Sequence, residues 1–259
     1  MTNPYKSTDE QGLILPRRCE KPRSWGLTAI MDTGIPIGEL EHILSDYHPY
    51  VDFAKFGIGS AYITPKLRDK LALYKSYDIP TCFGGTLFEK FYSEGKLDAY
   101  MGFVEKLGVE WIEISNGTLP ASHDEILAAV RKVSPHFNVV AEVGSKDVDV
   151  IMPPSQWLHD IRSFLDAGCR YVIMEGRDSA SVGLYRQTGE VRTGLVADIL
   201  SNIDHKKLIF EAPTSQSQIY FIKLVGANVN LGNVSLRDIL TLECQRVGLR
   251  GDTFFMDKD

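Results

Sequence analysis

Several short apolar runs in this sequence end in acidic residues, a pattern that could bring carboxylates together in one site. The run Tyr171–Met174 has the length and β-branched content of a strand buried on both faces, and Glu175, Gly176 and Arg177 follow it. Burial normally excludes such charges, so they suggest a functional site at the end of the strand. Acids stand at corresponding points elsewhere in the chain, at Asp32, Glu113, Glu142 and Glu211.

Carboxylates crowded together repel one another and need a cation among them. Mg²⁺ meets this need directly, because it prefers oxygen ligands and keeps several waters, which leaves positions for substrate oxygens. The expected ligands are two or three of Glu142, Glu175, Glu211 and Asp32. The alternative is a structural network in which the acids pair with Lys55, Lys146 or Arg177. We favour the metal for the set as a whole, because a fold that needed only stability would place apolar residues there.

Two glycine-containing segments could hold an anion. The first, Gly84-Gly85-Thr86, leads into a predicted helix, whose first backbone N–H groups attract negative charge. The second contains Asn230, Gly232 and Asn233 and lies after the last predicted strands, where barrels often bind phosphate. The alternative is that these glycines serve only the turns in which they lie.

We expect a lysine or a glutamate to transfer protons, because no histidine stands at a predicted strand end. Glu113 is one of the candidates. Cys82 and Cys169 are expected to be small buried hydrophobic residues, and not nucleophiles.

The elements that must position these residues alternate between strand-like and helix-like segments. Eight strands alternating with eight helices predict a (β/α)₈ TIM barrel, an α/β fold of about 250 residues whose functional groups gather at the carboxyl ends of the strands. An open doubly wound sheet is the alternative, disfavoured because no G-x-G-x-x-G follows the first strand. We expect residues 1–22 to form an N-terminal arm and residues 23–259 to form one catalytic barrel domain. The predicted strands are 25–31, 51–56, 79–83, 111–115, 137–143, 171–174, 208–210 and 228–231.

Composition narrows the class of partner. The chain of 259 residues has a net charge of −6 and no basic block, which argues against nucleic acid and anionic membrane surfaces. No stretch approaches the ~18 apolar residues of a membrane span, and the four cysteines lie far apart. We therefore expect a reduced, cytoplasmic protein with a small anionic substrate, and a homo-oligomer, as is common for barrels of this kind.

Several motifs in order give the chain a specific resemblance, extending from Lys21 to Phe254, to the phosphosulfolactate synthase family. They are Lys21-Pro22-Arg23, Lys55-Phe56-Gly57, Gly84-Gly85-Thr86-Leu87-Phe88-Glu89, Ile112-Glu113-Ile114-Ser115-Asn116-Gly117-Thr118, Glu142-Val143-Gly144, Phe210-Glu211-Ala212-Pro213, Asn228-Val229-Asn230-Leu231-Gly232-Asn233 and Gly248-Leu249-Arg250-Gly251-Asp252-Thr253.

The resemblance implies a carbon–sulfur lyase on a (β/α)₈ barrel, which adds sulfite to phosphoenolpyruvate with Mg²⁺ on routes to coenzyme M and sulfolactate. Sulfite would attack the methylene carbon, Mg²⁺ would stabilise the resulting aci-carboxylate, and a lysine would protonate the neighbouring carbon. Lys146 or Lys55 is the candidate acid, with a pKa lowered by burial. Arg177 and the two glycine segments would hold substrate oxygens.

Two positions depart from the pattern of the family. Members that the chain resembles carry two adjacent lysines after Glu-Val-Gly, whereas Ser145 precedes Lys146 here. They also commonly carry a lysine soon after Glu-Ala-Pro, whereas the segment that includes Ser215 has none. This leaves two alternatives open: a paralogue that acts on another carboxylate or enol substrate, and a non-catalytic protein similar to plant heat-stress-associated proteins.

Overall fold

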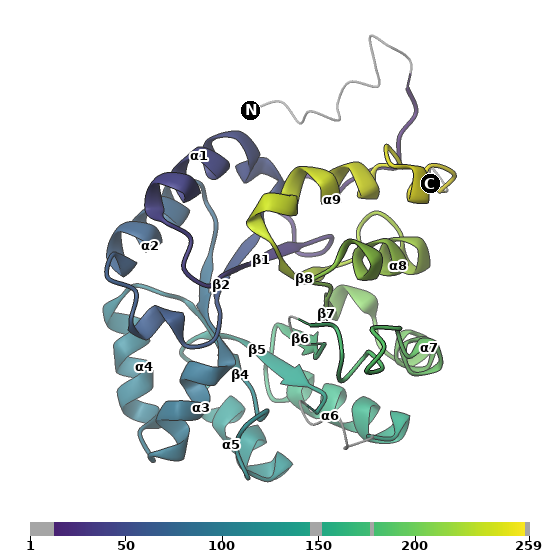
Figure 1. The fold of residues 1–259 in the computed structure, drawn as a ribbon. Coiled ribbons are helices and arrows are strands. Elements are labelled where there is room, and N and C mark those ends of the chain that lie inside the picture. Colours follow the sequence, from purple (N-terminus) through teal and green to yellow (C-terminus); the bar gives the residue numbers. More distant parts are fainter. Residues whose placement is uncertain (1–12, 146–151, 177–178, 257–259) are drawn as a thin grey trace.

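A computed structural model describes residues 13–145, 152–176 and 179–256, and these residues form a closed barrel of eight parallel strands (Figure 1). Each strand pairs with the next, and β8 pairs with β1 to close the sheet. The predicted (β/α)₈ fold is therefore confirmed. The strands are β1 (Thr28–Asp32), β2 (Phe53–Phe56), β3 (Thr81–Phe83), β4 (Trp111–Ile114), β5 (Asn138–Val143), β6 (Tyr171–Met174), β7 (Leu208–Glu211) and β8 (Leu231–Val234).

Helices surround the strands as an outer ring (Figure 1). Two helices lie between β3 and β4, and Gly95, whose φ of 67° favours glycine, lies between them. A capping box between Ser122 and Glu125 fixes the start of α5. The helices are α1 (Ile37–Tyr47), α2 (Leu67–Ser76), α3 (Gly85–Ser93), α4 (Leu97–Lys106), α5 (His123–Val133), α6 (Pro154–Asp166), α7 (Thr193–Asn202), α8 (Ser215–Val225) and α9 (Ile239–Arg246).

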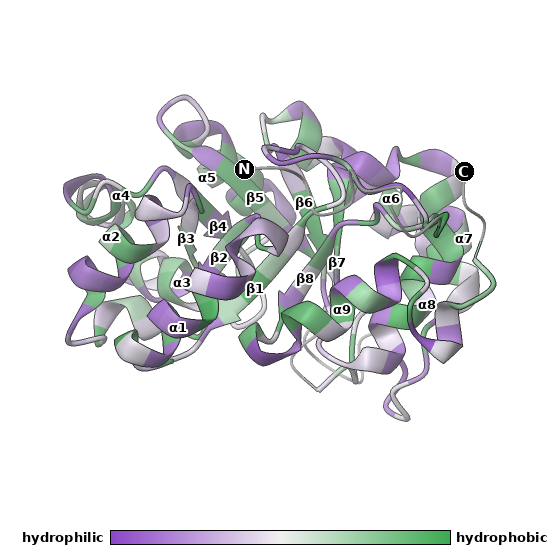
Figure 2. Cartoon of the chain, turned by 90° about the horizontal axis from the view of Figure 1, so that it is seen from above, coloured by the Kyte–Doolittle hydropathy of each residue, from purple (hydrophilic) through white to green (hydrophobic). Residues whose placement is uncertain are grey.

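Alternation along the strands divides the core into two layers. Side chains of one parity pack between the strands and the helices. In Figure 2 the surrounding helices carry both apolar and polar colour along their ribbons. Side chains of the other parity fill the barrel interior as a separate cluster, formed by Ala29, Phe53, Cys82, Val140, Ile173 and Ile209. Cys82 is fully buried in this cluster, as predicted, and burial raises the pKa of its thiol well above the ordinary value.

The last strand begins three residues later than expected. We predicted a strand at 228–231, but β8 spans Leu231–Val234, and its pairing with β1 is irregular between Thr28 and Ile30. Asn230 therefore precedes the strand and lies at the amino end of the barrel, whereas Asn233 stands at the carboxyl end.

The described part of the N-terminal segment is tied to the amino end of the barrel. Arg18 is 7% exposed, and its Nε lies 2.7 Å from Oε1 of Glu243 in α9. Lys21 donates to the carbonyl oxygens of His48 and Val51. Residues 18 and 21 of the predicted arm are thus fixed at the amino end of the barrel. Among the described residues, no helix combines the length and the apolar character that a membrane span requires.

Candidate active site

Strand parity explains why charged side chains meet inside the barrel. Phe53 and Ile209 point into the interior cluster, so Lys55 and Glu211, two residues further along their strands, also point inward and lie one layer higher. The same count from Val140 and Ile173 places Glu142 and Glu175 in this upper layer. Four predicted site residues thus share one layer at the carboxyl ends of the strands.

Lys55 lies between two glutamates of this layer. Its Nζ is 3.0 Å from Oε2 of Glu113 and 3.3 Å from Oε1 of Glu211. Lys55 is 8% exposed, Glu113 3% and Glu211 2%. Water screens such buried charges weakly, so the three groups form one electrostatic unit.

The pKa of Lys55 shifts in the direction opposite to our expectation. Burial alone would lower the pKa, but the negative charges of Glu113, Glu211 and Glu142 outweigh burial and raise it well above 10.5. Burial raises the pKa of Glu211, and Lys55 opposes that rise. Lys55 therefore holds its proton at neutral pH, and the prediction of a lysine whose pKa is lowered by burial was wrong for this residue.

The glycine segment at the start of α3 already binds a carboxylate of the protein itself, that of Glu113. The backbone N–H of Gly85 donates to Oε1 of Glu113 over 2.6 Å. A Cβ on Gly85 would lie 2.1 Å from Oγ of Ser115, so the close approach requires glycine. The hydroxyl of Ser115 donates in turn to Glu89, which also accepts from the N–H of Gly117. The start of α3 therefore orients Glu113 towards Lys55.

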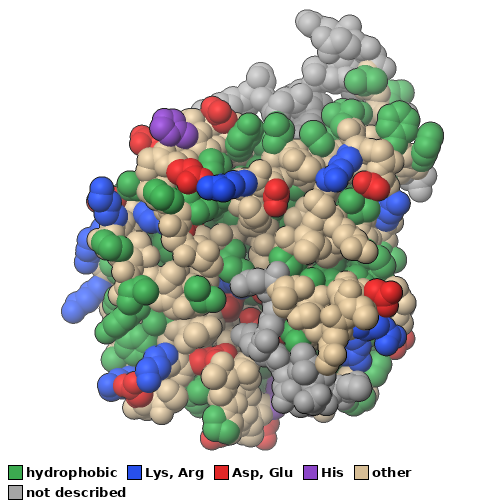
Figure 3. Space-filling view, viewed as in Figure 1, with side chains coloured by type: hydrophobic (Ala, Val, Ile, Leu, Met, Phe, Trp, Pro, Cys, Tyr) green, Lys and Arg blue, Asp and Glu red, His purple; other side chains and the backbone are tan. Residues whose placement is uncertain are grey.

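A cavity of about 390 Å³ opens above this layer. In the space-filling view, carboxylate surface shows in the hollow at the middle of the molecule (Figure 3). Of the predicted site residues, the cavity brings together Lys55, Gly84, Gly85, Thr86, Glu113, Glu142, Glu175, Glu211 and Asn233. The sequence reasoning missed five further lining residues, Met31, Gly57, Ile58, Thr118 and Ser179. Strand parity counted from Ala29 would have identified Met31, whereas the other four lie in loops without a periodic pattern.

Asp32 does not reach this cavity. It shares the parity of Ile30, which packs in the outer layer, and its side chain points away from the interior. Lys70 donates to Oδ1 over 2.7 Å, and the hydroxyl of Tyr74 donates to Oδ2 over 3.0 Å. The structure thus places Asp32 in a buried ion pair with α2, so we withdraw it from the expected metal ligands.

Asn230 and Gly232 also lie away from the cavity mouth. The side chain of Asn230 accepts from the N–H of Leu27 and donates to the carbonyl oxygen of Leu208, which joins the amino ends of three strands. Gly232 lies in the interior, where a Cβ would be 3.0 Å from Ile209. Both residues therefore have a structural role in the barrel, and neither lines the cavity at its carboxyl end.

The described side chains that line the cavity offer the oxygen ligands and the negative charge that a hard cation needs. Four carboxylates face the cavity, and the described lining includes one ammonium group to balance them. Among the described residues, no three acids of the mouth bring their oxygens within 4.8 Å of one another. One or two carboxylates with waters and substrate oxygens, the coordination that Mg²⁺ favours, fit this spacing. Lys146 and Arg177 lie outside the described residues.

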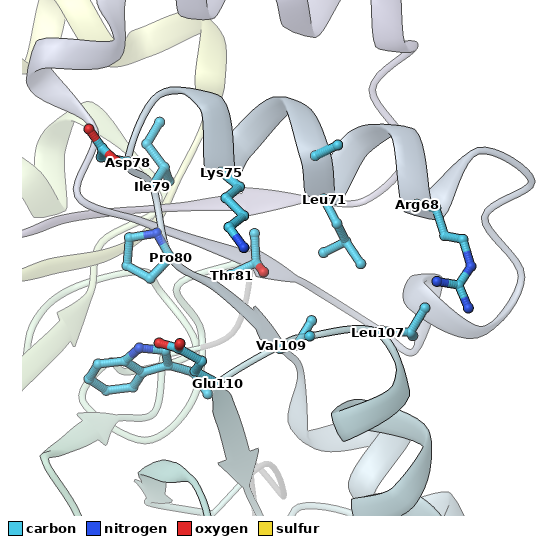
Figure 4. Close-up of a pocket in the computed structure, with 13 residues that line it drawn as sticks. Arg68, Leu71, Lys75, Asp78, Ile79, Pro80, Thr81, Leu107, Val109 and Glu110 are labelled. Atoms are coloured by element: carbon cyan, nitrogen blue, oxygen red, sulfur yellow. The ribbon is translucent and has the colours of Figure 1, made fainter.

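Two larger hollows lie at the opposite end of the barrel. One, of about 470 Å³, is lined by Arg68 and Lys75 of α2 and by Thr81 and Val109 near the starts of β3 and β4 (Figure 4). The other, of about 960 Å³, borders Trp25 and residues before β7 and β8. Since barrel enzymes react at the carboxyl ends of their strands, we assign the candidate active site to the smaller, charged cavity.

Known proteins match the chain over most of its length. Residues 16–252 match the family model of (2R)-phospho-3-sulfolactate synthase. The chain is 42% identical over 247 residues to a phosphosulfolactate synthase of Bacillus subtilis, covering 94% of this chain and 98% of that protein. It is 39% identical over 235 residues to a phosphosulfolactate synthase of Methanocaldococcus jannaschii, covering 88% and 94%.

A solved structure supports the fold. That of 3-keto-L-gulonate-6-phosphate decarboxylase from Vibrio cholerae superposes with a TM-score of 0.55 at 13% identity, covering 85% of this chain and 97% of that one. This likeness concerns the fold alone. The sequence matches, in contrast, show that the chain belongs to the phosphosulfolactate synthase family.

Proposed function

We propose that this protein adds sulfite to phosphoenolpyruvate in the presence of Mg²⁺ and forms phosphosulfolactate. Membership of the family supports the proposal. The observation that carries it is the buried ammonium group of Lys55 between Glu113 and Glu211, inside a cavity of small-molecule size at the carboxyl ends of the strands.

The reaction forms one carbon–sulfur bond and consumes one proton. The sulfur lone pair of sulfite attacks C3 of phosphoenolpyruvate, and the π electrons of the C2–C3 bond move towards the carboxylate. The resulting aci-carboxylate then takes a proton at C2, and the phosphate ester stays intact. A bound Mg²⁺ supplies Lewis-acid stabilisation of the carboxylate oxygens, with Glu142 and Glu175 as the ligands that we propose.

Lys55 is assigned to charge stabilisation. Its ammonium group is fixed by two carboxylates before the substrate binds, so it needs no reorganisation as negative charge grows on the substrate. Its raised pKa makes it a poor proton donor at neutral pH. Lys146 is therefore the candidate donor to C2.

Substrate oxygens need hydrogen-bond donors as well as a cation. Thr86 lies in the first turn of α3 and lines the cavity. Asn233 lines it too, holds a φ of 55°, and carries a side-chain amide whose N–H groups are donors. A polar group held in such a conformation fits a role in substrate binding. We propose that both side chains contact phosphate or carboxylate oxygens.

The test is an assay of the purified protein with both substrates and Mg²⁺. The proposal predicts that phosphoenolpyruvate disappears only when sulfite is present, and that a chelator abolishes the reaction. Consumption that does not depend on sulfite, or none at all, would contradict it.

Ser145 favours a second candidate function. It stands two residues after the end of β5, at a position where family members carry a lysine. A paralogue that binds a less charged carboxylate or enol substrate would need fewer cations there. Replacing Ser145 with lysine should then create or raise synthase activity, whereas no change would argue against this candidate. Several buried charges in one cavity also argue against a non-catalytic protein.

A further inference from the structure

Helices α5 and α6 bring two histidines and an aspartate together, outside the barrel interior. His123 is the first residue of α5, and His159 and Asp160 lie within α6. One ligand atom from each of the three lies within 4.8 Å of the other two. Among the described residues, this is the one group of three or more histidine, cysteine or acidic side chains gathered so closely.

Ser163 of α6 holds the ring of His123. Its hydroxyl oxygen lies 2.9 Å from the carbonyl oxygen of Asp160 and 2.8 Å from Nε2 of His123. In the tautomer in which the hydroxyl donates to the carbonyl oxygen, Nε2 donates to Ser163 and Nδ1 is an acceptor.

This acceptor faces another acceptor. Nδ1 of His123 lies 3.3 Å from Oδ1 of Asp160, a carboxylate that is 8% exposed. Two lone pairs at this distance repel each other unless a cation lies between them. The cation is either a proton on the imidazole or a metal ion.

The distance separates these two possibilities. A charge-assisted N–H···O bond is about 2.7–2.9 Å long. Ligands bound at about 2.0–2.2 Å to a tetrahedral zinc ion stand about 3.3–3.5 Å apart. The 3.3 Å between His123 and Asp160 is long for the first arrangement and matches the second.

The surroundings of the cluster supply the remaining requirements of such a site. Oδ1 of Asp160 also accepts from Nε2 of Gln156 over 2.7 Å, and Ser163 orients the ring of His123, so both proposed ligands are held by further hydrogen bonds. The exposed ring of His159, 5.5 Å from that of His123 between centroids, can supply a third ligand, and water a fourth.

We propose that His123, His159 and Asp160 bind a zinc-like divalent ion that links α5 to α6. Imidazole ligands select metals of this class over Mg²⁺, so the site is chemically distinct from the carboxylates of the barrel mouth. The ion would join the helices on either side of β5, the strand that leads to Glu142. This inference does not depend on the reaction proposed above.

The test measures Zn²⁺ binding to the full-length, chelator-treated protein by competition with a chromogenic chelator, in excess Mg²⁺. The variants are His123→Gln and His159→Gln, and the matched control is His42→Gln, an exposed histidine on α1 outside the cluster. We expect one Zn²⁺ per chain in the wild type and the control, and at least about tenfold weaker binding in each cluster variant. Zn²⁺ should also raise the melting temperature of the wild type and the control, but not that of His159→Gln.

Because His159 is exposed, its replacement leaves the packed core intact, and the comparison stays valid even if His123→Gln folds poorly. Absence of Zn²⁺ binding in the wild type would overturn the proposal. Equal affinity in the wild type and His159→Gln would overturn it as well, because the ion would then lie elsewhere.

Discussion

Nζ of Lys55 lies 3.0 Å from Oε2 of Glu113, inside the barrel, where both residues line the candidate active site. A second buried lysine, Lys70, pairs with Asp32 in the outer layer, between β1 and α2. The two ion pairs are alike in chemistry and differ in the face of the sheet on which they lie. Replacing each lysine in turn therefore distinguishes effects on catalysis from effects on stability.

Replacing Lys55 with methionine should abolish most of the activity. The variant loses the ammonium group that stabilises developing negative charge, so we expect kcat to fall by about 10²–10³. Steady-state assays with saturating Mg²⁺ measure this. Lys70→Met, assayed at a temperature where it is folded, is the control and should keep kcat within a few-fold of the wild type. Equal losses in both variants would contradict the role of Lys55.

Replacing Lys70 with methionine should instead destabilise the fold. It leaves the carboxylate of Asp32, which is 0% exposed, without its cation. Removing one partner of a buried pair costs about 3–5 kcal/mol, a loss that denaturant unfolding can measure. The double variant Lys70→Met with Asp32→Asn should recover part of the loss. A single variant as stable as the wild type would show that Asp32 does not need the lysine.

Gly85→Ala tests the contact at the start of α3. The added methyl group would meet Ser115 and disturb the hydrogen bond from Gly85 to Glu113. We expect a loss of about 1–3 kcal/mol in stability together with reduced kcat. Gly102→Ala in α4 is the matched control, because nothing lies within 4 Å of its Cβ position. Alanine in a helix interior should stabilise that variant by about 0.5–1 kcal/mol.

Replacing a proposed metal ligand should weaken Mg²⁺ binding, whereas replacing Asp32 should not. Glu142→Gln should weaken Mg²⁺ at least about tenfold in a calorimetric titration, because it removes a charged oxygen ligand. Asp32→Asn should leave Mg²⁺ affinity unchanged, since Asp32 faces α2. If the second variant weakened Mg²⁺ as much as the first, our placement of the metal would be wrong.

The stability at acid pH should depend on Glu243. Burial would raise the pKa of this carboxyl, but the guanidinium groups of Arg18 and Arg246 outweigh burial and hold the pKa below 4.5. The stabilisation is therefore complete above pH 4.5 and is lost as the pH falls through the lower, folded-state value. The difference in unfolding free energy between the wild type and Glu243→Gln should shrink from neutral pH to about pH 3. A difference that is constant or grows would contradict this linkage.

The barrel and most of its charged layer could be predicted from the sequence, because both follow from periodicity. Apolar runs that end in Lys55, Glu113 or Glu211 determine which strands carry charge, and a closed parallel barrel brings their ends together. The face on which Asp32 lies could not be predicted, because apolar residues stand at both parities before it in the sequence.

Other features depend on tertiary contacts and could not be predicted. β8 begins at Leu231, three residues later than expected, so Asn230 lies at the amino end of the barrel. Gly85 was expected to bind a substrate anion, but its N–H donates to the carboxylate of Glu113 on the next strand. The raised pKa of Lys55 needs three charges from separate strands, and no local pattern reveals their distances.

Carbon NMR of phosphoenolpyruvate labelled at C3 tests most directly whether the carbon–sulfur bond forms at that carbon. With sulfite, Mg²⁺ and the wild-type protein, the vinyl methylene signal should give way to that of a saturated methylene bonded to sulfur, while the phosphate ester remains intact. Lys55→Met should form this product far more slowly. An unchanged vinyl signal, or release of phosphate without a new methylene signal, would contradict the proposed function.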